Sequence, residues 1–294
     1  MILLLAAAVT IPLGLDLYMP VPGDNPLTVE KIELGRQLFF DRRLSRDSSI
    51  ACSSCHEPEK AFSDDHAIAV GIFGRQGRRN APALINRGYG RSFFWDGRVS
   101  TLEEQVLKPI QDPNEMDLPL AETAARVGLP AEMISHSLAS YVRSLVSGGS
   151  PFDHFINGDR AALSTEARAG LDVFRGKGNC IACHVGPNFT DESLHNTGIA
   201  WRDGKLADVG AGRGDFKTPT LREVSRTAPY MHDGSLATLE NVIDYYDRGG
   251  NRNSNLDPEL RPLHLTVADK IGLAAFLRSL VGRSSDVESK SARH

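Results

Sequence analysis

The apolar residues of this chain recur mainly at the spacing of an α-helix. After Pro130, the residues Ile134, Leu138, Tyr141 and Leu145 fall on one helical face. Cap residues and apolar spacing predict four more helices: Thr28 to Phe40, Ser100 to Leu107 with Glu103 completing a capping box, Ser164 to Phe174, and Thr266 to Leu280. Alternation typical of strands is scarce. The pattern therefore predicts a mainly α fold.

The longest apolar run lies at the start of the chain, from Ile2 to Leu15. Pro12 and Gly14 interrupt it, and it is too short to predict a membrane span. We interpret residues 1–26 as a signal or anchor segment, with a buried apolar N-terminus as the alternative. The remaining composition is that of a globular protein, with 41% hydrophobic and 24% charged residues. A net charge of −4 without a long basic run argues against a nucleic-acid partner.

The four cysteines fall in two C-x-x-C-H motifs: Cys52, Cys55 and His56 form the first, and Cys180, Cys183 and His184 form the second. This motif is the attachment signature of c-type haem, in which two thiols bind one porphyrin and the histidine binds its iron. A four-cysteine zinc site or a pair of disulfides would leave both histidines unexplained. The motifs therefore predict two covalently bound c-type haems. Because such haems are attached beyond an energy-coupling membrane, we expect a periplasmic protein.

The two halves of the chain also repeat one another. Asp96–Gly97 recurs as Asp233–Gly234, and Thr101–Glu103 recurs as Thr238–Glu240, each 137 residues later. The two haem motifs are only 128 residues apart, so the second half carries about nine extra residues. We place this insertion in the glycine-rich stretch Gly204–Gly214 and expect it to be a loop.

This repeat predicts two cytochrome-c-like haem domains related by internal duplication. We expect the N-terminal haem domain to span residues 27–150 and the C-terminal one to span 151–283. Gly148–Pro151 is the predicted linker, and the polar residues 284–294 are expected to form a flexible tail.

From about Leu34 to Leu280, the sequence resembles the bacterial dihaem cytochrome c peroxidases and the related MauG-type enzymes. Besides the haem motifs, five segments carry the resemblance: Leu38–Asp41, Phe93–Arg98, Leu102–Gln105, Phe216–Arg222 and Pro229–Gly234. The resemblance implies that the N-terminal haem is the peroxide site. It also implies that the C-terminal haem relays electrons.

The second axial position of each haem is expected to decide its role. In the family, the C-terminal haem takes a ligand that aligns with Tyr246, where peroxidases commonly have Met and MauG-type enzymes have Tyr. Tyr245 is a rival ligand, and simple helix packing is the alternative for Tyr246. The residue 137 positions earlier is Pro109, which cannot bind a metal.

A loop histidine blocks the resting N-terminal haem in many family peroxidases. The aligned residue here is Ile72, which also cannot bind iron. We therefore predict a site that is open without reductive activation. His66 could substitute as a ligand, although we expect it to be a solvent-exposed loop residue.

The resemblance assigns three further roles at or near the peroxide site. Glu115 would move the proton that O–O cleavage requires, and Gln105 would orient peroxide or water. Trp95 would pass electrons between the haems. A solvated loop acid and a core aromatic are the alternatives for Glu115 and Trp95, respectively.

The family also binds calcium at its domain junction through an Asn side chain and backbone carbonyls. Asn80, Thr227 and Pro229 match this set, and their oxygens suit calcium. Three oxygens would leave part of the coordination shell to water.

We predict a periplasmic dihaem peroxidase that reduces hydrogen peroxide to water. Electrons would come one at a time from a small cytochrome c or cupredoxin, and a homodimer is common in the family. One alternative is a MauG-like enzyme that oxidatively modifies a partner protein, which Tyr246 and Ile72 both favour. The other is a non-catalytic dihaem electron carrier, which would require both sixth positions to be filled.

Overall fold

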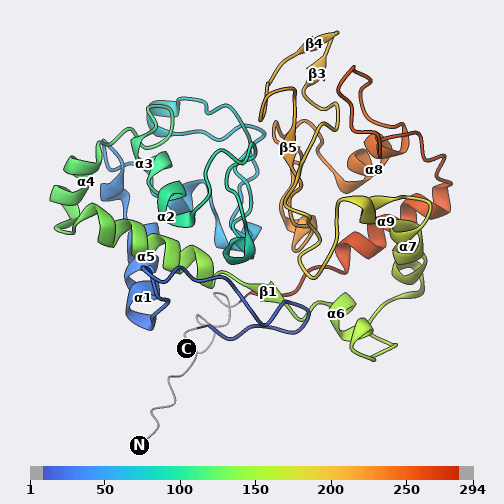
Figure 1. Ribbon diagram of the computed structural model, residues 1–294, viewed down its shortest axis with the longest axis horizontal. Coiled ribbons are helices and arrows are strands. Elements are labelled where there is room, and N and C mark those ends of the chain that lie inside the picture. The colour runs from blue at the N-terminus through green and yellow to red at the C-terminus, as the bar shows by residue number, and fades with distance from the viewer. Residues whose placement is uncertain (1–8, 285–294) are drawn as a thin grey trace, which may run out of the picture.

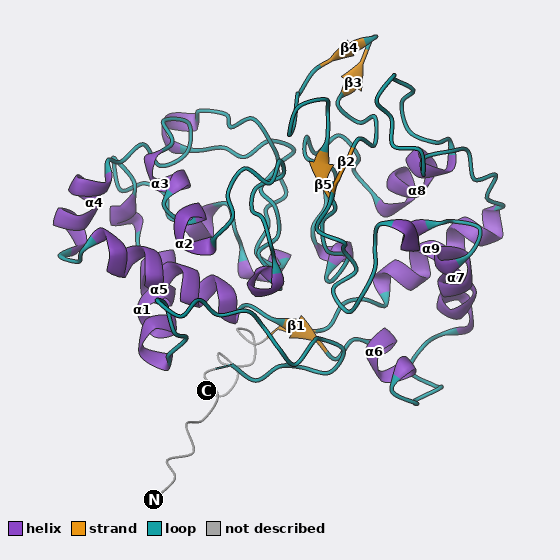
Figure 2. Ribbon diagram, in the orientation of Figure 1, coloured by secondary structure: helices purple, strands orange, loops and turns teal. Residues whose placement is uncertain are grey.

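The computed structural model describes residues 9–284 and shows two mostly helical lobes joined by a short linker (Figures 1 and 2). The first lobe contains α1 (Val29–Phe39), α2 (Leu102–Gln105), α3 (Lys108–Gln111), α4 (Leu120–Val127) and α5 (Ala131–Ser144). The second contains α6 (Pro151–Ile156), α7 (Thr165–Arg175), α8 (Leu239–Asp247) and α9 (Val267–Arg278). Within residues 9–284, no helix is long and apolar enough to cross a membrane.

Strands are few and very short. They form three antiparallel pairs: β1 (Ser147–Gly148) with β6 (Arg283–Ser284), β2 (Leu194–His195) with β5 (Phe216–Lys217), and β3 (Trp201–Arg202) with β4 (Lys205–Leu206). The mainly α prediction is therefore confirmed. The β3–β4 hairpin covers part of the predicted Gly204–Gly214 insertion, which otherwise has no regular structure apart from a single bridge.

Each lobe is built on one pair of closely packed helices, α1 with α5 and α7 with α9. Glycine permits the close approach in both pairs. A Cβ added to Gly35 of α1 would lie 1.9 Å from the carbonyl oxygen of Ser137, and one added to Gly170 of α7 would lie 1.8 Å from that of Gly272. Two separate apolar cores surround these crossings.

Most predicted helix starts agree with the structure, since Thr28, Ser164 and Thr266 each cap a helix. The helix predicted from Ser100 to Leu107 is wrong in both of its ends. Thr101 is the cap, and its hydroxyl accepts a hydrogen bond from Glu104 N at 3.2 Å. Helix α2 then stops at Gln105, because Pro109 has no N–H to donate to the Gln105 carbonyl.

The segment before α1 runs along both lobes. Leu13 O accepts a hydrogen bond from Gly149 N at 2.7 Å, and Asp16 O accepts one from the Tyr89 hydroxyl at 2.8 Å. The buried Asn25 side chain donates to Glu103 at 2.7 Å. Residues 1–8 of the predicted signal or anchor segment lie outside the described residues.

The lobes meet through a reciprocal pair of backbone hydrogen bonds. Asn80 N donates to His232 O, and Lys217 N donates to Trp95 O, both at 2.8 Å. Lys217 and His232 each lie 137 residues after Asn80 and Trp95, respectively. The same offset relates the Phe93–Val99 bridge to the Tyr230–Leu236 bridge. Segments at matching positions of the two halves thus contact each other across the junction.

Candidate haem sites

The first C-x-x-C-H motif forms a single tight turn. Its residues Cys52–Ser54 are a 3₁₀ helix, and His56 N donates to Cys52 O at 3.1 Å. The His56 ring is oriented by a 2.9 Å hydrogen bond between Nδ1 and Phe62 O. Because a carbonyl only accepts, Nδ1 carries the proton and Nε2 keeps its lone pair for a metal.

The second motif has the same geometry. Cys180–Ala182 form a 3₁₀ helix, His184 N donates to Cys180 O at 2.9 Å, and His184 Nδ1 lies 2.9 Å from Phe189 O. Phe62 and Phe189 share a left-handed backbone, with φ of 58° and 52°. The sequence therefore builds the same arrangement twice.

Burial shifts the pKa of the thiols and of the imidazoles at these motifs. Burial is the main cause that raises the pKa of Cys52, Cys55 and Cys180 to about 12, so these thiols stay neutral. Burial also lowers the pKa of His56 and His184, which keeps both imidazoles neutral and able to bind iron. Two thiols and one free imidazole nitrogen at each motif match the donor set of a c-type haem.

The two tyrosines of α8 have different surroundings. The Tyr245 hydroxyl donates to Thr197 O at 2.8 Å and accepts from Asn251 N at 3.1 Å, so its hydrogen bonds are satisfied. The Tyr246 hydroxyl has no hydrogen bond to any residue of the described part of the chain. Burial raises the pKa of Tyr246 above its usual range, and the nearby Cys183 and Cys180 contribute to the rise. Tyr246 thus lies near the cysteines of the second motif, and its hydroxyl is not engaged by any residue in 9–284.

The loop next to the first motif carries Ile72 fully inside the protein. Ile72 N donates to Glu115 O at 2.8 Å, which fixes this loop against the segment after α3. Pro109 lies in the first turn of α3. His66 exposes 57% of its side chain, and its Nδ1 is 3.5 Å from the Asp65 carboxylate.

Glu115 is brought next to the first motif. Its charge contributes to the raised pKa of both Cys52 and Cys55. Burial raises the pKa of Glu115 to about 7, Asp112 adds to the rise, and Arg98 opposes it. Gln105 is the half-buried last residue of α2, and no hydrogen bond joins it to Glu115 within residues 9–284.

Trp95 is held by both lobes. Its indole nitrogen donates to Asn80 O at 2.9 Å, and its own carbonyl accepts from Lys217 N of β5. Of the predicted calcium ligands, Asn80 contacts both Trp95 and His232, and His232 follows Pro229 by three residues in the sequence. Among the described residues, Asn80 Oδ1 and the carbonyls of Thr227 and Pro229 accept no hydrogen bond.

Sequence reasoning missed two charged clusters. Arg79 bridges Asp96 and Asp208 beside Trp95. His195 lies 2.6 Å from Asp257 and 2.9 Å from Asp191, so carboxylates occupy both of its ring nitrogens next to Cys183. Their partners are far apart in sequence, and no local motif marks them.

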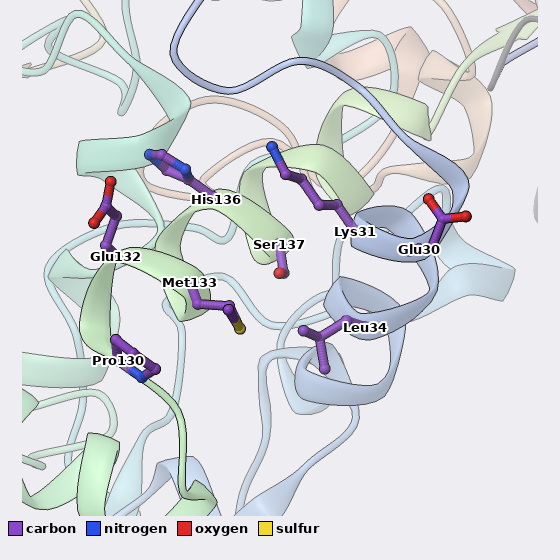
Figure 3. A pocket seen from close by; sticks show the side chains of 8 residues that line it. All are labelled: Glu30, Lys31, Leu34, Pro130, Glu132, Met133, His136 and Ser137. Carbon is purple, nitrogen blue, oxygen red and sulfur yellow. The ribbon is translucent and has the colours of Figure 1, made fainter. Parts of the chain in front are cut away.

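A surface groove lies between α1 and α5 (Figure 3). It is lined by Glu30, Lys31, Leu34, Pro130, Glu132, Met133, His136 and Ser137. None of the predicted site residues belongs to this set, so the groove is not part of the haem sites.

The fold and the two motifs define a two-lobed helical protein of the c-type cytochrome class. Residues 29–130 match the family model described as di-haem cytochrome c peroxidase. The chain is 39% identical to the methylamine utilization protein MauG of Methylorubrum extorquens, over 89% of this chain and 81% of that protein. It is 34% identical to the cytochrome-c peroxidase IdrP1 of Pseudomonas sp. strain SCT, over 89% and 83%.

Among solved structures, a MauG-like protein associated with microbial copper homeostasis superposes with a TM-score of 0.84. The two chains are 32% identical, and the match covers 92% of this chain and 95% of the other. The chain belongs to the di-haem cytochrome c peroxidase and MauG family of oxidoreductases. This confirms the resemblance read from the sequence, and membership implies two c-type haems.

Proposed function

We propose that this protein is a periplasmic peroxidase that reduces hydrogen peroxide to water with electrons from a small redox protein. The observation that carries the proposal is the pair Ile72 and Pro109, which cannot bind iron and stand at the two positions that the family resemblance and the internal repeat assign to a second iron ligand of the first haem. A half-buried carboxylate with a pKa of about 7, Glu115, lies near the cysteines of the same motif. An open metal position beside a titrating acid suits peroxide chemistry better than simple electron carriage.

Internal duplication accounts for the architecture. The matching helix pairs, the two equal haem motifs and the reciprocal hydrogen bonds at the junction all support it. The domains would then be 27–150 and 151–283, with the β3–β4 region as an addition to the second copy. A peroxide site and an electron-entry site could arise in this way from one ancestral cytochrome domain.

The residues that would hold the haems follow from the donor sets. Cys52 and Cys55 would attach the first haem and His56 would bind its iron. At the second, Cys180 and Cys183 would be the attachment points, with His184 and Tyr246 as the two iron ligands. When bound, each haem supplies an iron that accepts and donates single electrons.

Glu115 handles the proton in this proposal. As a carboxylate it takes the proton from the inner oxygen of peroxide, and it then delivers that proton to the outer, leaving oxygen. Gln105 holds peroxide or water in line through its amide. The complete reaction consumes one peroxide, two electrons and two protons, and it releases two waters.

Trp95 carries electrons from the second site to the first. Its position supports this role, because its indole is bound by the first lobe and its carbonyl by the second. We further propose that Asn80, Thr227 and Pro229 bind calcium at this junction. Their three oxygens, which accept no hydrogen bond from residues 9–284, are hard donors of the kind that calcium prefers.

A MauG-like modification of a partner protein is the second candidate. Tyr246 favours it, since the resemblance associates Tyr at this position with MauG-type enzymes, and an anionic oxygen ligand would stabilise higher oxidation states. Both candidates share the open first site and Glu115. They differ in the source of the electrons, which is a small redox protein in the peroxidase and the modified side chains of the partner protein in the MauG-like enzyme.

A stoichiometric assay separates the two functions. Holoprotein is mixed with a limiting amount of hydrogen peroxide and an excess of reduced cytochrome c or reduced cupredoxin. We expect two molecules of donor to be oxidised per peroxide, at a rate that saturates with donor. A parallel reaction contains an added test protein. Peroxide consumption that does not depend on either donor, but that oxidises side chains of the test protein, would contradict peroxidase function and favour the second candidate.

A further inference from the structure

The insertion in the second half reaches back to the first lobe next to Trp95. Asp208 follows β4, and its two carboxylate oxygens each lie 2.8 Å from a nitrogen of Arg79. Gly210 N also donates to Asp208 at 2.9 Å, which fixes the carboxylate on its own loop. Asp208 lies in the stretch Gly204–Gly214, where we place the extra residues of the second half, and its pairing with Arg79 joins the lobes.

Arg79 transmits this contact to the segment that contains Trp95. Its third nitrogen donates to Asp96 at 2.7 Å, so one guanidinium is shared between carboxylates of the two lobes. Arg79 precedes Asn80, which accepts the indole hydrogen bond, and Asp96 follows Trp95. The Arg79–Asp96 ion pair therefore joins the same two segments of the chain as the Trp95–Asn80 hydrogen bond.

The surroundings favour a well-ordered contact. The side chains of Arg79, Asp96 and Asp208 expose only 15%, 13% and 23% of their surface. Arg79 also lies over the Phe216 ring at 5.2 Å, and Phe216 precedes the Lys217 that holds Trp95 O. The hydrogen bonds from Arg79 lower the pKa of Asp208 to about 2, so the carboxylate is ionised in any ordinary buffer. Bidentate pairing of a half-buried arginine is directional and resists rotation.

We propose that Asp208 and Arg79 form a clamp across the domain junction that positions Trp95 for electron transfer between the two haem sites. Asp208 is a positioning residue, since it acts on Trp95 through Arg79 and Asp96. This inference rests on the proposed role of Trp95. It also gives a function to the predicted insertion Gly204–Gly214, which contains Asp208.

The test follows electrons across the junction. Holoprotein with both haems reduced is mixed with hydrogen peroxide in a stopped-flow instrument, and reoxidation of each haem is followed at its own absorption maximum. We expect Asp208→Asn to slow reoxidation of the second haem about tenfold, because small displacements of a positioned group carry large kinetic costs. The reaction of the first haem should keep its wild-type rate. Asp208→Glu, which restores the carboxylate, should recover part of the loss.

Two controls keep the outcomes distinct. Asp203→Asn removes the same charge from the exposed turn between β3 and β4 and should leave both reoxidation rates unchanged. Trp95→Phe tests the relay itself and should slow the second haem at least as much as Asp208→Asn. If Trp95→Phe slows reoxidation of the second haem and Asp208→Asn does not, the positioning role of Asp208 is wrong and electron transfer through Trp95 is supported. If neither variant slows reoxidation of the second haem, both the electron-transfer role of Trp95 and the positioning role of Asp208 are wrong. If the Asp208→Asn protein does not bind both haems, Arg79→Lys is used in its place. Lysine keeps the positive charge but cannot bind both carboxylates, and the same criteria apply.

Discussion

Replacing Glu115 by Gln is expected to lower the rate of peroxide consumption about a hundredfold or more, the usual loss when a positioned acid–base group is removed. The amide fits the same space but can neither accept the proton from the inner oxygen nor return it to the outer one. Donor oxidation measured at saturating peroxide gives the rate. Glu104→Gln is the matched control, since Glu104 is an exposed residue of α2 that forms an ion pair with Lys108, and it should retain full activity.

The pH dependence of the rate adds a second criterion for Glu115. Burial and Asp112 raise its pKa to about 7, and Arg98 works in the opposite direction. The carboxylate is the active form in the first proton transfer, so the rate should rise with pH and level off above about 7. Glu115→Gln should lose this rise. A variant that keeps both its rate and its pH profile would exclude Glu115 from the chemistry.

Replacing Tyr246 by Met is expected to raise the reduction potential of the second haem by roughly 0.2 V, because a neutral thioether stabilises the ferric state less than a phenolate. Potentiometric titration of each haem band measures the shift. Tyr245→Phe is the control on the same helix. It removes hydrogen bonds to Thr197 and Asn251 and should leave the potential nearly unchanged. Equal potentials in wild type and Tyr246→Met would show that Tyr246 is not a ligand.

The parts of this structure that depend on short sequence segments could be predicted from the sequence. The haem turns are local, since in each motif the histidine N–H donates to the carbonyl oxygen of the first cysteine. Helix α9 has a complete capping box and was predicted to within two residues. By contrast, the start of α2 required a choice between the adjacent Ser100 and Thr101, which pattern alone does not make.

The contacts between distant segments could not be predicted. In the sequence, the resemblance alone distinguishes Tyr246 from the adjacent Tyr245. The contact with Thr197, 48 residues away, shows that the Tyr245 hydroxyl is already occupied. Arg79 and Asp208 are 129 residues apart, and no periodicity connects two single charges in loops. Such pairs depend on how the two lobes pack, which the repeat suggests but does not specify.

The proposed open peroxide site predicts that the first haem accepts peroxide without prior reduction, because Ile72 aligns with the histidine that blocks this site in many peroxidases of the family. Ile72→His should restore that block, and Ile72→Val should not, since valine is also apolar and nearly fills the buried site. The histidine variant is expected to show a six-coordinate first haem in the oxidised protein.

The most direct test is to add hydrogen peroxide to fully oxidised holoprotein and to record the haem spectrum within seconds. We predict a rapid spectral change in the wild type and in Ile72→Val, and none in Ile72→His until the protein has been reduced. An unchanged wild-type spectrum would mean that another group, such as His66, blocks the site at rest. The account of an open peroxide site would then be wrong.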